Sequence, residues 1–392
     1  MEVSHFWFLR TAGGRLSGLF TRAQGALPER QVPRASLGRA AALPWLLLAV
    51  FAVPAAANDQ CAEIHRKQKE SAAPEFRLQG VTVTVENDLF APGQTTDRWY
   101  TSGIHGAWSY KVAHTPQLLH GWQNFWSDVF GSARCATVSG GVGHSIYTPR
   151  RIDIAAAQPL DRPWAGFLYG GLGAYHFAEG APGRQGYHEA VDLKLGVIGP
   201  ASLAAPIQRG WHHLINSPQP QGWANQLRPA LGVQISYRRT WRYQLPGDLR
   251  LHPFAGGTLG NTRTQAVAGA TLHFAGAGHL VSDADEGDFA TLDFNNRQND
   301  HGNWGAYVQL QGKAVLYNRF LTGPAYGQRT EIEMQRGVAT ASIGLMYKVS
   351  NQLRLSYALK RRSPEFFSPN LNRRDAYQTW GGITLIWDFD VD

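Results

Sequence analysis

The stretch VTVTVE, Val81–Glu86, places a valine at every second position with a polar residue between. Side chains of an extended strand point alternately to its two faces, so this period of two predicts a half-buried β-strand. The same alternation recurs over 191–197, 231–238 and 353–360. Candidate strands cover 79–89, 100–112, 136–147, 165–178, 187–197, 228–241, 249–260, 264–275, 303–316, 333–347, 352–361 and 378–389. The sequence therefore predicts an all-β chain with an even number of strands, twelve.

Alternation alone fits two architectures. A soluble sandwich buries its apolar faces, whereas an outer-membrane barrel turns them to lipid and lines its lumen with polar residues. Aromatic residues stand near strand ends, as the interfacial girdles of barrels do: Trp108, Tyr110, Tyr237, Trp241, Trp387 and Phe389. Together with the export signal described next, this favours a twelve-stranded antiparallel transmembrane β-barrel over residues 78–389. Such a barrel belongs in the outer membrane of a Gram-negative bacterium.

The N-terminal region has the composition of a secretory signal peptide. The apolar run AALPWLLLAVFAVP, Ala41–Pro54, follows Arg34 and Arg39 and precedes three alanines at 55–57. A positive flank, a short apolar core and small residues are the parts of such a peptide. The run is too short to be a good membrane-spanning helix. We assign residues 1–57 to a signal peptide with an extended n-region.

Charge and cysteine usage restrict the partners. The formal charge is +8, and residues 1–57 contain six Arg and two Glu, so half of the excess lies there. A mildly basic remainder fits an anionic partner. No basic run interleaved with aromatics indicates nucleic acid, and we expect none. Residues 58–77 form a leader before the barrel. Its Cys61 and the later Cys135 would meet an oxidising compartment, where a disulfide and two free thiols are both possible.

The segment Gly196–Leu227 contains the residues with the clearest catalytic chemistry. It predicts a short loop helix in which Gln208 and His212, four positions apart, share one face. An imidazole can activate water near neutral pH, and an amide can orient the water or an acyl oxygen. The alternative is a loop helix whose polar residues face solvent.

Three polar segments are expected to meet at one end of the barrel. With a periplasmic N-terminus, the first, third and fifth gaps between strands are extracellular. The first gap begins at Asn87-Asp88 and returns towards Thr101, the third holds Arg150-Arg151, and the fifth holds the loop helix. Taken singly, Asn87-Asp88 is more often turn chemistry and Arg150-Arg151 a solvated pair. Their convergence nevertheless predicts a site at the outer rim.

Five segments, in this order, make the chain similar to the outer-membrane lipid A 3'-O-deacylases. They are VEND at 85–88, YTSG at 100–103, YTP at 147–149, DRPWAG at 161–166 and the segment 196–227. The resemblance covers about residues 78–389. It implies a twelve-stranded barrel with a short extracellular loop helix and a site between that helix and the outer barrel wall. The implied reaction is ester hydrolysis by an activated water, with calcium (Ca²⁺) helping to stabilise the oxyanion.

The resemblance also implies a role for each matching residue. His212 would be the general base, and Gln208 would line the site one helical turn away. Asn87 and Asp88 would hold the metal or polarise the ester carbonyl, with Thr101 supporting them from the next strand. A hard cation prefers such oxygen ligands. The sequence contains no G-x-S-x-G motif for a serine nucleophile.

Two further points concern the substrate and the base. Arg150 and Arg151 occupy the region where basic residues would meet the lipid A phosphates, for which arginine forks are suited. The family pairs its histidine with an acidic residue a few positions on, and no acid follows His212 in this loop. Asn216, Gln219, a backbone carbonyl or an acid from elsewhere would have to orient the imidazole.

The sequence therefore predicts a carboxylic ester hydrolase that removes the 3'-linked acyloxyacyl chain from lipid A or lipopolysaccharide. Two rivals remain at this point. One is an outer-membrane phospholipase, with the same ester chemistry on another head group. The other is a catalytically silent structural barrel. The absent acid after His212 slightly favours this rival, and the complete set of candidate site residues opposes it: Asn87, Asp88, Thr101, Gln208 and His212. We expect the barrel to be a monomer.

Overall fold

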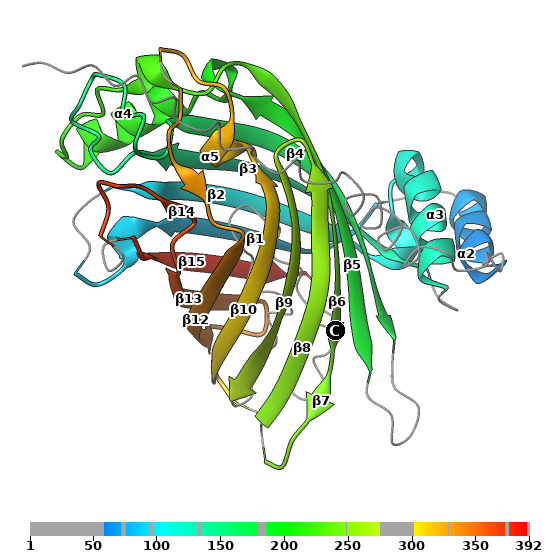
Figure 1. The fold of residues 1–392 in the computed structure, drawn as a ribbon. Helices are drawn as coiled ribbons and strands as arrows, with labels where there is room; N and C mark the ends of the chain where they lie inside the picture. The colour runs from blue at the N-terminus through cyan, green and yellow to red at the C-terminus, as the bar shows by residue number, and fades with distance from the viewer. Residues whose placement is uncertain are drawn as a thin grey trace, which may run out of the picture. The chain divides into compact units, whose positions relative to one another are not determined.

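A computed structural model describes residues 59–71, 76–93, 97–131, 135–178, 186–247, 249–274, 302–327, 329–372 and 376–389. Within these ranges, twelve antiparallel strands close into a barrel (Figure 1). They are β1 (Leu78–Asn87), β2 (Trp99–Tyr110), β3 (Thr137–Thr148), β4 (Ala165–Ala178), β5 (Tyr187–Ile198), β6 (Ala230–Trp241), β8 (Leu249–Gly260), β9 (Arg263–Phe274), β10 (Trp304–Asn318), β12 (Gly337–Lys348), β13 (Leu353–Arg362) and β15 (Gln378–Asp388). Pairing of β1 with β15 and of β6 with β8 completes the ring. The predicted barrel is confirmed.

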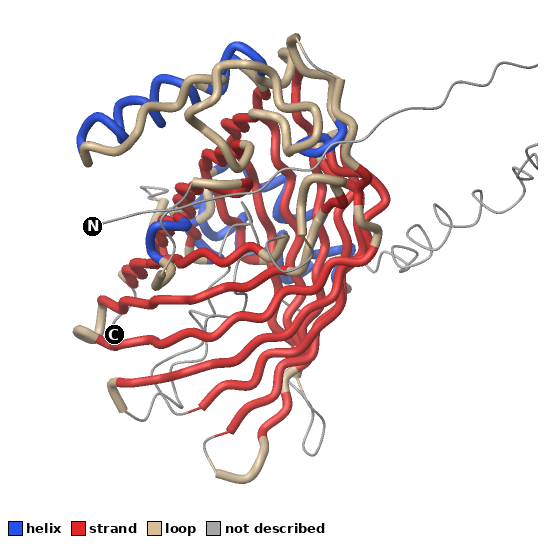
Figure 2. The backbone as a smooth tube through the Cα atoms, turned by 60° about the vertical axis from the view of Figure 1, so that its left-hand side comes forward, coloured by secondary structure: helices blue, strands red, loops and turns tan. Residues whose placement is uncertain are grey.

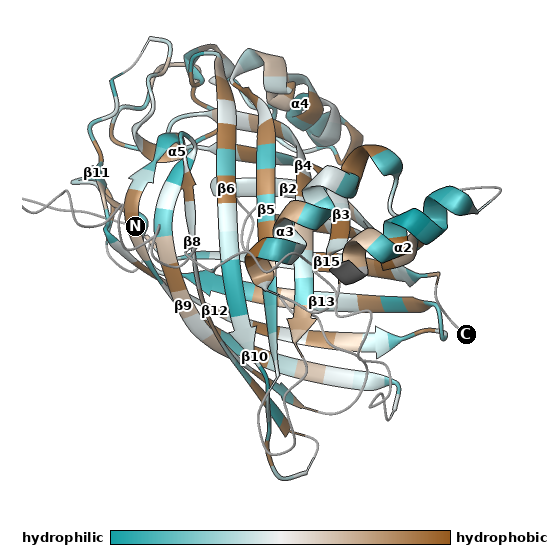
Figure 3. Ribbon diagram, turned by 90° about the vertical axis from the view of Figure 1, so that its right-hand side faces the viewer, coloured by the Kyte–Doolittle hydropathy of each residue, from teal (hydrophilic) through white to brown (hydrophobic). Residues whose placement is uncertain are grey.

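Burial along the strands shows which face meets lipid. Val83, Ile104 and Leu310 are 40%, 47% and 62% exposed, whereas the lumen-facing Gln309 and Lys360 are buried. Figure 3 shows apolar residues, in brown, recurring along the strands. Apolar side chains outside and polar ones inside are the arrangement of a membrane barrel and the reverse of a soluble sandwich.

The predicted strand ranges all overlap the observed barrel strands, and one began too early. The range 333–347 includes Glu333–Met334, which forms the short strand β11 and pairs with β14 (Phe366–Phe367) outside the barrel sheet. The barrel strand itself begins at Gly337. A further two-residue strand, β7 (Tyr243–Gln244), pairs with β8 beyond the end of β6.

The first of two long connections, 113–134, contains helical structure. Two short 3₁₀ helices, η2 (Val112–His114) and η3 (Gln117–Leu119), lead into helix α3 (His120–Phe130). The second, 276–302, was expected to be mobile and lies, except for its last residue, outside the described residues. Among the described helices, none has both the length and the apolar character needed to cross a membrane.

A disulfide joins the segment before the barrel to the start of β3. The expected leader contains helix α2 (Asp59–Glu70), and its Cys61 is bonded to Cys135 with a Cα–Cα distance of 5.0 Å. Of the two alternatives open from the sequence, the structure has the disulfide. Closing a loop of this length restricts the unfolded chain and stabilises the fold by about 4 kcal/mol. The expected signal peptide, residues 1–57, lies outside the described residues.

The start of β2 and the end of β3 lie at the opposite end of the barrel from α3. Most of the loops and short helices at that end belong to the site. Helix α4 (Ala204–Leu214) follows η4 (Pro200–Ser202), and η5 (Trp223–Asn225) leads back to the barrel. The loop after β10 holds α5 (Arg319–Thr322). Figure 2 shows these helices, in blue, with long tan loops at one end of the red strands.

Candidate active site at the α4 end of the barrel

Helix α4 presents Gln208 and His212 on its buried face. Gln208 is 3% and His212 1% exposed, whereas the neighbouring His213 faces solvent. Leu203 directly precedes the helix, and its left-handed φ of 61° turns the chain sharply after η4. Residues one turn apart share a helix face, so this register brings the amide and the imidazole together.

Both ring nitrogens of His212 have partners. Nδ1 lies 2.6 Å from the carbonyl oxygen of Pro218, and Nε2 lies 2.7 Å from Oδ2 of Asp97. A carbonyl oxygen only accepts hydrogen bonds, so Nδ1 is the protonated donor. Of the alternatives for orienting this histidine, the structure uses a backbone carbonyl on one nitrogen and an acid from another loop on the other.

Asp97 was missed by the sequence reasoning. It lies between η1 (Asp88–Phe90) and the start of β2, far from α4 in sequence, and no motif includes it. Its neighbour Arg98 donates its backbone N–H to Oδ2 of Asp88 at 3.0 Å, and Arg98 O accepts from Gln378 at 2.9 Å. These bonds position the loop so that Asp97 reaches His212. One feature of the sequence pointed to Asp97: its loop joins the two strand ends that hold the VEND and YTSG segments.

Asp88, Asp97 and His212 form one hydrogen-bonded row. Burial and the neighbouring Asp97 carboxylate raise the pKa of Asp88 well above its ordinary value. Burial on its own would lower the pKa of His212, but its hydrogen bonds to Asp97 and to the Pro218 carbonyl raise it above 6.5. Two adjoining carboxylates repel each other, so one of them keeps a proton unless a cation lies between them. The row can therefore hold a cation or a proton beside a base.

Asn87 lies on the strand side of this row. It is 7% exposed, and its side-chain oxygen accepts a hydrogen bond from Leu89 N at 2.8 Å, which caps η1. Asn87 therefore has the structural role in a turn that was the alternative expected from its sequence position. Together with Asp88, it offers only oxygen atoms as metal ligands, the type that hard cations prefer.

The two polar atoms of the Gln208 amide differ in their contacts. Its Oε1 accepts a hydrogen bond from Trp223 Nε1 at 2.9 Å, which fixes the orientation of the amide. Its buried Nε2 has no hydrogen-bond partner in the described part of the chain. A buried donor without a partner costs about 1–3 kcal/mol, so such a group indicates a place for a ligand oxygen or water.

Thr101 forms a buried hydroxyl pair with Thr148. Their Oγ1 atoms are 2.7 Å apart, and the two residues are 2% and 0% exposed. A bulge between Tyr100 and Ser102 interrupts the pairing of β2 with β3 at this point. Thr101 therefore supports the strand ends next to Asn87 but makes no hydrogen bond to His212 or Asp88 among the described contacts.

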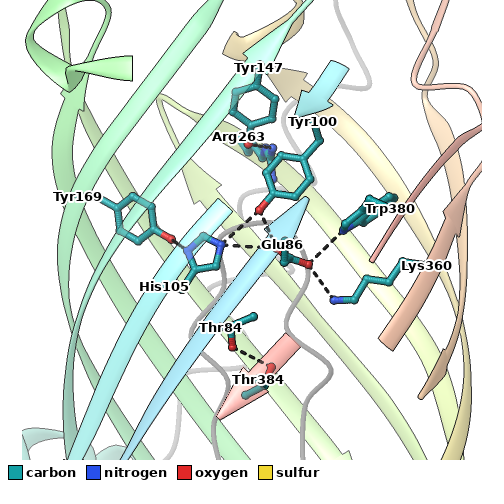
Figure 4. Close-up of polar contacts among 10 residues, drawn as sticks. All are labelled: Thr84, Glu86, Tyr100, His105, Tyr147, Tyr169, Arg263, Lys360, Trp380 and Thr384. Carbon is teal, nitrogen blue, oxygen red and sulfur yellow. Dashed lines mark hydrogen bonds and ion pairs between the residues drawn. The ribbon is translucent and has the colours of Figure 1, made fainter. Parts of the chain in front are cut away.

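A polar cluster inside the lumen lies behind this end of the wall (Figure 4). Glu86 Oε2 accepts from Tyr100 OH at 2.6 Å, and Oε1 accepts from Lys360 Nζ and Trp380 Nε1, each at 3.1 Å. His105 adds a contact of 3.5 Å to the same carboxylate. All five side chains are buried.

The lumen cluster acts on the two strands that hold the site. Glu86 directly precedes Asn87 on β1, and Tyr100 directly precedes Thr101 on β2. Because successive side chains of a strand point to opposite faces, the cluster fixes these strand ends from inside while Asn87 stands outside. The sequence reasoning noted Glu86 only as part of a motif.

Arg150 and Arg151 lie in the exposed loop between β3 and β4. Arg151 pairs with Asp153 at 2.7 Å, and the backbone N–H of Arg150 donates to Asp161 at 2.9 Å. Both arginines line an open cleft of about 330 Å³ with Phe366 and other loop residues. No α4 residue contributes to the described lining, so the structure groups the arginines with this cleft and not with His212.

Comparison with known proteins identifies the family of this chain. The family model of outer membrane protein LpxR matches residues 43–389. The chain belongs to the LpxR family. No relative matches among curated protein sequences.

One of three similar solved structures supports the family's fold, and the other two are more distant. LpxR from Salmonella typhimurium is 17% identical with a TM-score of 0.61, and the match covers 79% of this chain and 100% of that one. The β domain of the Bordetella autotransporter BrkA is 12% identical with a TM-score of 0.40, over 80% and 99%. The KdgM porin is 7% identical with a TM-score of 0.37, over 79% and 99%. As a member of the LpxR family with a lipid-facing barrel, the chain is an outer-membrane protein.

Proposed function

We propose that this LpxR-family protein is an ester hydrolase that removes the 3'-linked acyloxyacyl chain from lipid A. The observation that supports it most directly is the environment of His212. Its Nδ1 is held by a backbone carbonyl, and its Nε2 contacts the half-buried carboxylate of Asp97, which lies beside the buried Asp88. A histidine fixed in one tautomer next to acidic groups is suited to general-base work.

The proposed reaction uses a water molecule as the nucleophile. The water replaces Asp97 Oδ2 next to His212 Nε2. His212 Nε2 then takes a proton from this water while the water oxygen bonds to the ester carbonyl carbon. The tetrahedral intermediate then breaks its bond to the sugar oxygen, which receives the proton back from the imidazolium. The products are the free acyloxyacyl fatty acid and the sugar with a free hydroxyl group. The free Nε2 donor of Gln208, one turn away, would orient the water or the carbonyl oxygen.

The same residues fit a calcium ion. Asn87 and Asp88 would hold it, because both are buried and offer oxygen atoms. The raised pKa of Asp88 marks a carboxylate whose charge lacks compensation, which a cation would supply. When bound, Ca²⁺ would stabilise the negative charge that develops on the ester oxygen.

Arg150 and Arg151 would act on the substrate's phosphates and not on its ester. Their guanidinium groups are exposed beside an open cleft in the loops. Planar guanidinium forks match phosphate oxygens. This separates head-group binding at the cleft from hydrolysis at α4.

Purified protein in detergent tests the proposal on two substrates. Mass spectrometry should show lipid A losing its 3'-acyloxyacyl group, while a glycerophospholipid in the same micelles stays intact. Hydrolysis of the phospholipid alone would favour the phospholipase. No hydrolysis of either substrate by folded protein with calcium present would favour the silent barrel.

A further inference from the structure

Helix α3 lies against the lipid-facing side of the barrel. Its Trp126 and Phe130 pack on Ala174 of β4 and Val191 of β5. Val191 shares its strand face with Leu195, which is 53% exposed on the outer wall. Figures 1 and 3 both show α3 alongside these strands.

The helix lies near the strand ends opposite α4. Ala174 is close to the end of β4, Val191 to the start of β5, and Tyr237, which also packs at this cluster, to the end of β6. Tyr237 belongs to the aromatic residues that the sequence places at strand ends. Since the chain enters β1 at this end, it is the periplasmic rim in the orientation expected from the sequence.

A second face of α3 is covered by α2. The rings of His65 and His120 stack with centroids 3.8 Å apart, and His65 Nε2 bonds Gln123 Oε1 at 2.8 Å. Gln123 Nε2 also donates to Ala136 O at 2.7 Å. With the disulfide next to it, this keeps α3 from leaving the wall.

On its outer side, α3 and the turn before it expose two large apolar residues. Phe125 is 56% exposed, and Leu118, just before the helix, is 84% exposed. Phe76, on the adjoining strand entry, is 62% exposed and contacts Tyr110 with ring centroids 6.3 Å apart. By contrast, the outward side chains of α2 are charged and include Lys67, 71% exposed. Large apolar side chains are more stable in an apolar surrounding than in water.

We propose that α3 is an interfacial helix that rests in the head-group region of the periplasmic, glycerophospholipid leaflet. Its exposed apolar side chains are continuous with the outer wall that already faces lipid, and helices with exposed apolar residues beside a membrane lie at this depth. Lipid is therefore the occupant that completes the surface. The charged face of α2 remains in water.

Site-specific fluorescence tests this placement. The native cysteines are bonded to each other, so Phe125→Cys and Leu118→Cys can be labelled singly with nitrobenzoxadiazole, and Lys67→Cys is the control. Each variant is folded, checked by heat-modifiable migration, and reconstituted into phosphatidylcholine vesicles with or without doxyl-labelled lipid. Labels at 118 and 125 should emit at shorter wavelength and lose fluorescence to the doxyl lipid, whereas the label at 67 should not.

Three outcomes would overturn the proposal. The first is that labels at 118 and 125 resemble the label at 67 and are quenched by aqueous iodide. The second is energy transfer between labelled copies without doxyl quenching, which would make a second chain the occupant. The third is doxyl quenching of all three labels alike, which would place the charged face of α2 in lipid as well. Because positions 118 and 125 are both exposed, at least one variant should fold.

Discussion

His212 Nε2 and Asp97 Oδ2 are 2.7 Å apart although α4 and the β1–β2 loop are distant in sequence. The contact joins the two halves of the candidate site, the loop helix and the barrel wall. It also connects the imidazole to Asp88, because Asp88 and Asp97 are hydrogen-bonded. The predictions below follow from this row of three residues and from the wall behind it.

The pH dependence of hydrolysis should report on His212. The base must be neutral, so the rate should fall as the pH falls through a pKa above 6.5. The Asp97 carboxylate raises that pKa, and Asp97→Asn should therefore move the acidic limb of kcat/KM to lower pH. His213→Ala should leave the limb in place. An unchanged limb in Asp97→Asn would show that Asp97 does not act on the base.

Chelation should remove activity, and calcium should restore it. Asp88→Asn should raise the calcium concentration needed, because it removes the only charge of the candidate ligand pair. Asp153→Asn, which alters an exposed carboxylate paired with Arg151, is the matched control. Binding can also be read from thermal unfolding, since calcium at 100 times its Kd would add about 2.7 kcal/mol to stability. Full activity in excess chelator would exclude the metal.

The two loop arginines should affect substrate binding more than chemistry. Arg150→Ala and Arg151→Ala should raise KM for lipid A with kcat nearly unchanged, as loss of uniform binding does. Arg66→Ala, an exposed arginine of α2, serves as the control. A fall in kcat without a rise in KM would place the arginines at the reacting centre instead.

The lumen cluster should determine the stability of the strand ends. Glu86→Gln removes the carboxylate that faces Lys360, and breaking such a buried pair costs about 3–5 kcal/mol. The unfolding midpoint in heat-modifiable migration should fall clearly. Thr84→Val is the comparison, because it removes one hydroxyl pair with Thr384 at 2.9 Å, worth about 1 kcal/mol. Equal midpoints in the two variants would contradict this role of Glu86.

The fold could be predicted because the apolar and polar residues of the sequence alternate with the side-chain period of a strand, which is two. The register of α4 could be predicted from a different period, the 3.6-residue turn of a helix, since Gln208 and His212 are one turn apart. Asp97 could not, because its contact depends on how two loops meet after the barrel closes. The Pro218 carbonyl could not either, since any residue has one.

Helices α2 and α3 show a second limit. Helix α3 packs on the outer wall through Trp126 and Phe130, and α2 contacts α3 through the His65–His120 ring stack. Both helices depend on contacts between segments that are distant in sequence, which no local pattern shows. The Cys61–Cys135 disulfide was open from the sequence because distance along the chain does not fix distance in space.

The most direct test of the central claim compares His212→Ala with His213→Ala on purified lipid A. Losing a general base typically lowers a rate by about two to four orders of magnitude. Mass spectrometry should show that His212→Ala, folded by heat-modifiable migration, releases almost no 3'-acyloxyacyl chain, while His213→Ala stays within a few-fold of the parent protein. Near-parental release by His212→Ala, or loss of release in His213→Ala alone, would contradict the assignment of the base.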